Sequence, residues 1–394
     1  MGERAKAGSG KMAYQEIMPL DIFSAQARVW ERLSQIRISK QVGGAYLFSG
    51  PVGCGKESLA IRFAQLLNCE TSSEKPCDTC PSCQRFRQLQ HEKLKLIFPL
   101  PAVRKKKDDG SGTSSTIGKG DMELVTEAIA KKAEDHFHKI KIPKSSRILI
   151  QSIRELRKTL YLKSEPSGRK IVLIFDAHLL SVGIGEAANA LLKILEEPPE
   201  NTTLILVTDH VELLLPTILS RCQRVGIPRL NDIFIQDWLQ MKMVKDSEIQ
   251  LLAGLSQGNI HQARFLISQP IGDLLKLVNG LVKMISNDNP DHWRKFTQTY
   301  SRLAHQDSAT LSFHFMMLKI WFRSANRLAR RVDDILHETS FKPGMERLIS
   351  TNPNADFSAI TFELEDAILS IPMNLYMPLI LTNLLLRIQK HLNP

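Results

Sequence analysis

The sequence predicts an α/β protein, with a parallel sheet in its first part and helices in its last third. An apolar run at 45–49 ends in a glycine-rich turn, and apolar residues then recur with helical spacing over 59–67. The runs 171–175 and 204–208 are continuously apolar and β-prone, which is typical of strands covered on both faces. After Asp232 such runs disappear and helical periodicity dominates. The strand, loop and helix at the first run predict a P-loop crossover.

Length and composition are those of a folded protein with more than one domain. A chain of 394 residues suits two or three domains of ordinary size. With 43% hydrophobic and 24% charged residues, wholesale disorder is excluded. Lys and Arg number 52 against 41 Asp and Glu, which favours phosphate-rich partners without specifying one. The chain has no run of roughly 18 apolar residues and no apolar signal-peptide core, so we expect a cytoplasmic location and no membrane contact.

The pattern of apolar residues divides the chain into three expected parts. The α/β domain occupies residues 1–228. A small helical lid is expected at 229–268 and a helical bundle at 269–394, because strand-like runs are absent there. Helical periodicity is clearest at 311–328 and 357–392.

Two features interrupt the α/β domain. Helical periodicity at 186–197 stops at Pro198, which cannot continue a helix. An insertion at about 99–145 begins with a segment, 101–121, that is rich in Arg, Lys, Gly, Ser and Thr. Such a composition buries little apolar surface, so we expect this insertion to be mobile, with a charged helix at about 122–139.

A phosphate-binding loop is predicted between the first strand and the following helix. Gly50, Gly53, Gly55 and Lys56 match the P-loop pattern up to its lysine. Glycines let backbone N–H groups close around phosphate oxygens, and the lysine adds a point charge. The next residue is Glu57, where a Ser or Thr hydroxyl would bind Mg²⁺, and a carboxylate there repels phosphate. A degenerate nucleotide site and a loop without nucleotide both stay open, and with them the binding of ATP and Mg²⁺.

The end of the strand at 171–175 carries a second departure from an ATPase. Asp176 stands where a Mg²⁺-coordinating aspartate would be, but Ala177 follows it in place of a glutamate that would activate water. Asp176 is then either a metal ligand or a cap of the strand end. Together with Glu57, Ala177 predicts that the fold of an ATPase is kept while its hydrolytic groups are absent.

Four of the six cysteines crowd into a short segment: Cys69, Cys77, Cys80 and Cys83. In a reducing cytosol such a cluster more often holds metal than disulfides. Four thiolates suit a closed tetrahedral Zn²⁺ site, which is structural and not catalytic. An iron–sulfur cluster is an alternative, although the downstream Cys-Pro of the ferredoxin pattern is missing, and free or oxidised thiols are another.

An arginine follows the stretch 213–219, which we interpret as a helix beyond the strand at 204–208. This is Arg221, between Ser220 and Cys222. An arginine on the rim of an α/β nucleotide domain either pairs with a local carboxylate or has a functional role. Its spacing alone does not decide between the two.

Several segments together carry a family resemblance. They are the first strand with its P-loop, the four cysteines, the run Asn189 to Pro199 and the run Leu215 to Cys222. The combination resembles the clamp-loader subunits of bacterial DNA polymerase III, which are AAA+ proteins, over about residues 20–265. The remainder is similar only in its helical character. The resemblance implies an AAA+ P-loop domain with an inserted zinc module at 69–83, a helical lid and a C-terminal helical collar.

The departures from the ATP-hydrolysing gamma/tau subunit of that family resemble the delta-prime subunit. Where gamma/tau has a hydroxyl after the P-loop lysine, a catalytic glutamate and a lid arginine, this chain has Glu57, Ala177 and His261. The resemblance places the family's sensor threonine at Thr208, with no hydrolysis to report. It implies that Arg221 is the catalytic trans-acting arginine finger, which points into the ATP site of a neighbouring subunit.

The sequence thus predicts a non-hydrolysing, delta-prime-like subunit of the DNA sliding-clamp loader, with structural Zn²⁺. The resemblance implies homologous subunits (gamma/tau and delta), the sliding clamp and primer-template DNA as partners. One rival hypothesis is an active ATPase of the gamma/tau kind, in which Glu57 binds Mg²⁺ directly. Another is a zinc-dependent nucleic-acid-binding module with a vestigial P-loop.

Overall fold

A parallel sheet organises the first part of the chain. The computed structural model describes residues 22–101, 119–161, 168–373 and 375–394. Within them, five strands pair in the order β2-β3-β4-β1-β5, and every pair is parallel. The strands are β1 (Ala45–Ser49), β2 (Leu94–Ile97), β3 (Lys170–Ile174), β4 (Thr202–Thr208) and β5 (Gln223–Gly226). The three predicted strands are thereby confirmed, with ends shifted by no more than two residues.

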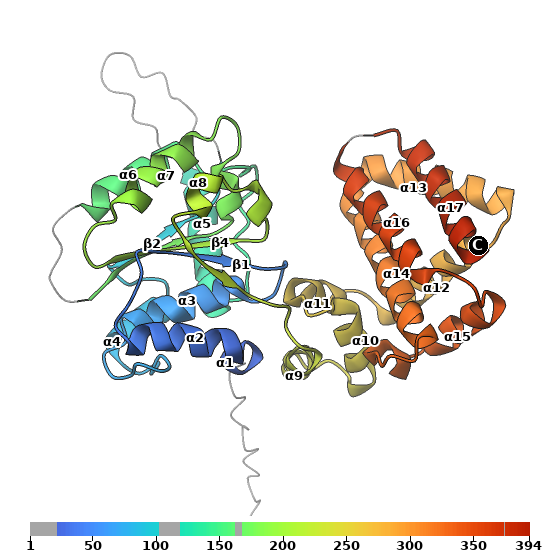
Figure 1. Cartoon of the computed structure of the whole chain (residues 1–394), viewed down its shortest axis with the longest axis horizontal. Coiled ribbons are helices and arrows are strands. Elements are labelled where there is room, and N and C mark those ends of the chain that lie inside the picture. The colour runs from blue at the N-terminus through green and yellow to red at the C-terminus, as the bar shows by residue number, and fades with distance from the viewer. Residues whose placement is uncertain (1–21, 102–118, 162–167, 374) are drawn as a thin grey trace, which may run out of the picture.

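Helices cover both faces of this sheet (Figure 1). The helices of this part are α1 (Ile22–Ala25), α2 (Ala27–Ile38), α3 (Lys56–Leu67), α4 (Pro81–Arg87), α5 (Lys119–Glu134), α6 (Ile150–Leu160), α7 (Glu186–Glu196) and α8 (Pro216–Leu219), with 3-10 turns η1 (Ala177–Leu180) and η2 (Val211–Leu213). In β1, Tyr46 and Phe48 pack towards α3, while Leu47 packs towards α6 and α7. Alternate residues therefore enter two separate cores, which explains why the central strands β1, β3 and β4 are largely apolar.

After β5, the described residues are helical. A first group is α9 (Asp232–Met241), α10 (Asp246–Ser256) and α11 (Ile260–Ile267). A second group is α12 (Ile271–Ile285), α13 (Pro290–Gln306), α14 (Ser308–Ala329), α15 (Lys342–Thr351), α16 (Phe357–Ser370) and α17 (Met377–Leu392), with the 3-10 turns η3 (Ile335–Glu338) and η4 (Ile371–Met373). The helical character predicted for this third is confirmed. Figure 1 shows the second group as a bundle separated from the sheet by the first group.

Two predicted helices differ from the structure. The charged helix expected at 122–139 is α5, which ends at Glu134, because the Asp135 carboxylate accepts a hydrogen bond from the backbone N–H of Phe137 at 2.9 Å and turns the chain. The helix expected at 213–219 is broken into η2 and α8, and Pro216 opens the second piece at a first-turn position that suits proline. The basic part of the predicted insertion, 104–107, lies outside the described residues.

No single helix in the described part of the chain is long and apolar enough to cross a membrane. The helices α11 and α12 pass that test only as a pair, and a bend of 109° separates them.

Candidate functional site

The loop predicted to bind phosphate lies between β1 and α3, as the P-loop pattern requires. Gly53 and Gly55 have positive φ angles of 71° and 85°, a conformation that favours glycine. A Cβ atom at Gly53 would lie 1.8 Å from Oδ1 of Asn259, the residue that caps α11. The loop therefore packs directly against α11, and Gly53 leaves room for that contact.

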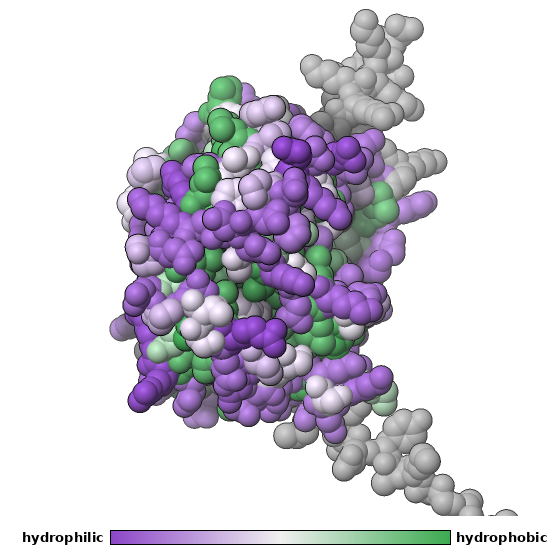
Figure 2. Space-filling view, turned by 90° about the vertical axis from the view of Figure 1, so that its right-hand side faces the viewer, coloured by the Kyte–Doolittle hydropathy of each residue, from purple (hydrophilic) through white to green (hydrophobic). Residues whose placement is uncertain are grey.

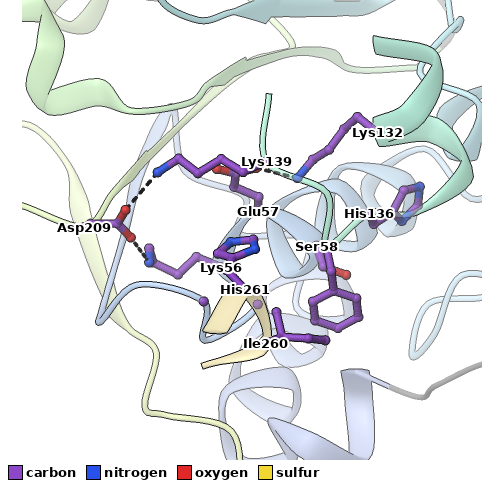
Figure 3. Close-up of a pocket in the computed structure, with 12 residues that line it drawn as sticks. Lys56, Glu57, Ser58, Lys132, His136, Lys139, Asp209, Ile260 and His261 are labelled. Carbon is purple, nitrogen blue, oxygen red and sulfur yellow. Dashed lines mark hydrogen bonds and ion pairs between the residues drawn. The ribbon is translucent and has the colours of Figure 1, made fainter. Parts of the chain in front are cut away.

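Lys56 begins α3 and is buried, with 5% of its side chain exposed. Its ammonium group forms an ion pair with Asp209 and donates a hydrogen bond to the backbone oxygen of Pro51 at 2.8 Å. Asp209 directly follows β4, so the carboxyl end of that strand supplies the counter-charge. The lysine that a P-loop offers to phosphate is thus already paired within the chain (Figure 3).

A second lysine, Lys139, joins two strand ends. Its Nζ lies 2.8 Å from Oδ1 of Asp176 and 3.0 Å from Oδ2 of Asp209. Asp176 makes no side-chain capping hydrogen bond to η1, which follows it. The side chain of Asp176 is therefore engaged by Lys139 and does not cap the strand end.

Glu57 faces a third lysine. Its carboxylate forms an ion pair with Lys132 of α5, whose side chain is 1% exposed, while that of Glu57 is 15% exposed. The Lys132 ammonium also lies 5.3 Å from the centre of the Phe175 ring, within the range of a cation–π contact. The negative charge of Glu57, which would repel a bound phosphate, is thus balanced by Lys132 of the same chain.

These contacts place three ammonium groups against three carboxylates in two neighbouring groups, which together we call the charge-balanced network: Lys56 and Lys139 with Asp176 and Asp209, and Lys132 with Glu57. Burial raises the pKa of Asp209, but Lys139 and Lys56 outweigh it and hold this pKa at about 2. Burial lowers the pKa of Lys139, and Asp176 and Asp209 more than reverse that effect, so its pKa is raised. Both groups therefore stay charged at neutral pH.

Little room is left beside the loop. The cavity there holds about 20 Å³, enough for a water molecule but far below the several hundred Å³ of a nucleotide-sized site. Phe137 closes it from one side, with its ring edge 3.1 Å from a Cβ built on Gly55. His261 closes it from α11, and burial lowers the pKa of this histidine to about 4, so the imidazole is neutral.

Thr208 turns away from the lysines of this network. Its hydroxyl lies 3.0 Å from Nδ1 of His178 and accepts the backbone N–H of His210 at 3.0 Å. The two histidine rings meet edge to face, with centroids 5.0 Å apart. Among the residues predicted for nucleotide binding, Thr208 is thus held by its own local contacts, although its neighbour Asp209 joins the network.

Arg221 lies at the amino ends of the strands, opposite the end that carries the P-loop. It stands just before β5, whereas the P-loop follows the carboxyl end of the neighbouring strand β1. Because these strands are parallel and Tyr46 pairs with Gln223, the two sites are at least about 10 Å apart along the strands. Arg221 is exposed and contacts Glu196, the last residue of α7.

The four predicted metal ligands converge. The Sγ atoms of Cys69, Cys77, Cys80 and Cys83 all lie within 4.8 Å of one another. Backbone N–H groups point at two of them, from Cys80 to Cys77 at 3.3 Å and from Cys83 to Cys80 at 3.4 Å. Hydrogen bonds from the hydroxyls of Thr71 and Thr79 lower the pKa of the Cys77 thiol to about 5, which favours the thiolate. The donor set fits a tetrahedral metal site, whose sulfur atoms would be about 3.8 Å apart.

The loop that carries these cysteines is fastened to the helices beside it. Arg62 of α3 binds both carboxylate oxygens of Asp78, at 2.6 and 2.7 Å, and such bidentate pairs fix geometry strongly. The indole N–H of Trp30 in α2 donates to the backbone oxygen of Glu74 at 3.0 Å. The cluster is therefore a module on the outer surface of α2 and α3.

Three charged residues of the network were missed by the sequence reasoning: Asp209, Lys132 and Lys139. Asp209 had a usable signal, because a carboxylate directly after a buried strand of a parallel sheet lies at the edge where ligands bind. The two lysines had none, since each is one of several basic residues in a charged segment.

Comparison with known proteins places the chain in a family. The sequence model for the family described as DNA polymerase III, delta subunit, matches residues 25–231, more than half of the chain. The tau subunit of Bacillus subtilis DNA polymerase III is 29% identical over 270 residues, 65% of this chain and 39% of that protein. The delta-prime subunits of Bacillus subtilis and Pseudomonas aeruginosa are 29% and 27% identical, over 60% and 67% of this chain and 58% and 67% of their own lengths.

The chain thus spans less than two thirds of the first two of these relatives. The crystal structure of a DNA polymerase III gamma subunit-related protein from Thermotoga maritima aligns over 92% of this chain and 99% of its own. The identity is 18% and the TM-score 0.36. The family match and the curated relatives agree with one another, and the chain belongs to the DNA polymerase III delta-subunit family, beside the delta-prime and tau subunits.

Proposed function

We propose that this chain is a non-hydrolysing, delta-prime-like subunit of the DNA sliding-clamp loader. It assembles in the cytoplasm with gamma/tau and delta subunits, supplies Arg221 to the ATP site of a neighbour, and helps to load the sliding clamp onto primed DNA during replication. Its relatives are named as DNA polymerase III delta-prime and tau subunits, which supports this assignment.

The observation that carries the proposal is the charge-balanced network beside the P-loop. A bound triphosphate would have to separate Lys56 from Asp209 and Lys132 from Glu57 in a space that holds about 20 Å³. Breaking such buried pairs leaves uncompensated charges, which costs several kcal/mol for each pair. Hydrolysis would also lack its chemistry, because Ala177 supplies no carboxylate to orient water and Glu57 supplies no hydroxyl for Mg²⁺.

The place of Arg221 supports a role in trans. Arg221 lies at the amino end of β5, whereas the P-loop lies at the carboxyl end of β1, so Arg221 is not in a position to contact a nucleotide at its own P-loop. A guanidinium is permanently charged and forked, so it neutralises charge that develops on a γ-phosphate. An arginine finger supplied by a neighbour changes phosphoryl-transfer rates by roughly 10³–10⁵-fold in well-studied systems.

Zn²⁺ is the metal that we assign to the four-cysteine cluster. Four thiolates without an open position make a structural site, which would staple a loop that has no core of its own. The cysteine side chains form a separate small buried cluster, apart from the two cores of the sheet. The role of the metal would be to hold the module at 69–83 against α2 and α3.

For the domains, we propose an AAA+ domain at 1–228, a lid at 229–268 and a collar at 269–394. A collar needs an apolar face for its partners. Leu379 and Leu386 of α17 are 65% and 54% exposed, and Phe362 and Leu369 of α16 are 65% and 58% exposed. In each helix the two residues are seven apart and share one face. Figure 2, which views the helical end of the molecule, shows apolar patches among the polar side chains.

The first test is nucleotide binding and hydrolysis by the isolated chain. We expect no ATPase activity and no binding of a fluorescent ATP analogue at concentrations where an active P-loop ATPase saturates. Ala177→Glu alone should not create activity, because Glu57 stays in place. Turnover that disappears in Lys56→Ala would instead support an ATPase of the gamma/tau kind, which the similarity to tau keeps as the second candidate.

The second test is reconstitution with an ATP-hydrolysing homologue, a delta subunit and a sliding clamp. We expect a stable complex whose ATPase is stimulated by clamp and primed DNA, and which loads the clamp. A complex whose only change is Arg221→Ala in this subunit should still assemble. It should load the clamp poorly and lose about the share of ATPase activity that one site contributes. Stable binding to DNA by the chain alone, without any assembly, would support the zinc nucleic-acid-binding module instead.

A further inference from the structure

The contact partner of Arg221 has no role in the function proposed so far. Nη2 of Arg221 lies 2.7 Å from Oε1 of Glu196, and Nη1 donates to the backbone oxygen of Thr217 at 3.0 Å. Glu196 ends α7, and Thr217 belongs to α8. Two acceptors from two different helices therefore fix the plane of the guanidinium.

Glu196 stands where a helix disfavours a carboxylate. The C-terminal end of α7 carries the negative end of the helix dipole, so an acidic side chain there is repelled. The Arg221 guanidinium offsets that repulsion, because it is charged and directly bonded. The adjacent Glu197 has no side-chain contact of this kind in the described structure; its backbone oxygen accepts the Tyr161 hydroxyl at 3.0 Å. The two neighbouring glutamates thus differ in their relation to Arg221.

These two contacts leave other hydrogen-bond donors of the Arg221 guanidinium for a ligand. A guanidinium has five N–H donors, and the two contacts take one from each Nη group. The other donors have no hydrogen-bond partner within the described part of the chain, and 35% of the side chain is exposed to solvent. An arginine held in this way meets a phosphate with much of its rotational freedom already lost, which favours a precise approach.

We propose that Glu196 is a positioning residue for Arg221. It holds the guanidinium in one orientation at the rim of the sheet, so that the finger is formed before a neighbouring subunit presents its nucleotide. The inference rests on the proposed function of Arg221 in trans. It assigns to Glu196 an effect on the neighbour's hydrolysis, although Glu196 touches no part of the substrate.

The experiment compares Glu196→Gln with Glu197→Gln in the reconstituted complex. ATP hydrolysis stimulated by clamp and primed DNA is measured as a function of ATP concentration. We expect Glu196→Gln to lose at least half of the kcat that Arg221→Ala loses, with KM unchanged, and Glu197→Gln to match the wild type. In the Arg221→Ala background, Glu196→Gln should change nothing further. Glu196→Asp, which keeps the charge, should recover part of the loss.

A second measurement uses the isolated chain. The side-chain N–H signals of Arg221 are followed by NMR, because hydrogen bonds to Glu196 and Thr217 slow rotation of the Nη groups. We expect this restraint to be lost in Glu196→Gln and kept in Glu197→Gln. An Arg221 that is equally restrained in both variants would overturn the inference without reference to any complex.

The outcomes separate the two proposals. If Arg221→Ala leaves ATPase and loading unchanged, the arginine finger itself is refuted. If Arg221→Ala lowers them while Glu196→Gln does not, only the positioning role fails. An additional loss from Glu196→Gln in the Arg221→Ala background would also refute it, because Glu196 would then act by another route.

Discussion

Replacement of Lys132 by methionine tests the charge-balanced network most directly. The substitution keeps the length and apolar stem of the side chain but leaves the Glu57 carboxylate without its partner. Removing one member of a buried ion pair costs about 3–5 kcal/mol. Lys132 is 1% exposed and Glu57 is 15% exposed, so some water still reaches the carboxylate and we expect a loss near the lower end, about 3 kcal/mol.

The assay is native-state hydrogen exchange of the backbone amides in α3 and α5. A loss of about 3 kcal/mol makes these amides exchange roughly 150-fold faster, if they open with the unit that holds the network. Lys131→Met is the matched control, because Lys131 is the preceding residue, is 54% exposed and pairs with the exposed Glu127. We expect that control to change the free energy of opening by less than about 1 kcal/mol.

The double variant Glu57→Gln/Lys132→Met completes the test. It removes both charges, so most of the lost stability should return, and the interaction between the two positions should be strongly non-additive. The reasoning is refuted if Lys132→Met costs no more than Lys131→Met. It is also refuted if the double variant is less stable than Lys132→Met alone.

Three further predictions follow from the other sites. The pKa of Asp209 is held at about 2, below its ordinary 3.8, so its charge stabilises the fold above about pH 4. This contribution, about 2 kcal/mol, should be lost as the pH falls towards 2. Urea unfolding of the Asp209→Asn variant should lack that pH dependence. Elemental analysis should find one Zn²⁺ per chain, lost in Cys80→Ser and kept in Cys54→Ser; iron in place of zinc would contradict the assignment. Leu379→Glu should leave the melting temperature of the isolated chain nearly unchanged, because the residue is exposed, while it weakens assembly measured by analytical ultracentrifugation.

The sheet and the cysteine cluster could be predicted because their signals are local. Strands buried on both faces are apolar at nearly every position, so 171–175 and 204–208 stand out without any knowledge of their neighbours. The four cysteines are close in sequence, and short turns are enough to bring their sulfur atoms together. In both cases the residues that form the feature also contain the sequence pattern that predicts it.

The network beside the P-loop could not be predicted in the same way. Lys132 and Lys139 come from a segment whose charge pattern indicates a solvated helix, and only the tertiary structure shows that they are buried. The meaning of Glu57 depends on them: without Lys132 it repels a phosphate, and with Lys132 it completes an ion pair. The sequence also did not predict that α5 ends at Glu134. The chain turns after this end, and Lys139 then reaches the strand ends.

Lys139 joins the ends of β3 and β4 by bonds that belong to the folded chain itself. A protein that binds ATP in its native state gains stability as the nucleotide concentration rises, by about 2.7 kcal/mol at one hundred times the dissociation constant. Under the proposed function, in which the loop binds no nucleotide, the Asp209 carboxylate takes the place of a phosphate beside Lys56, at a local concentration that never changes. The proposal therefore predicts that the resistance of the isolated chain to unfolding and proteolysis does not change with the ATP concentration.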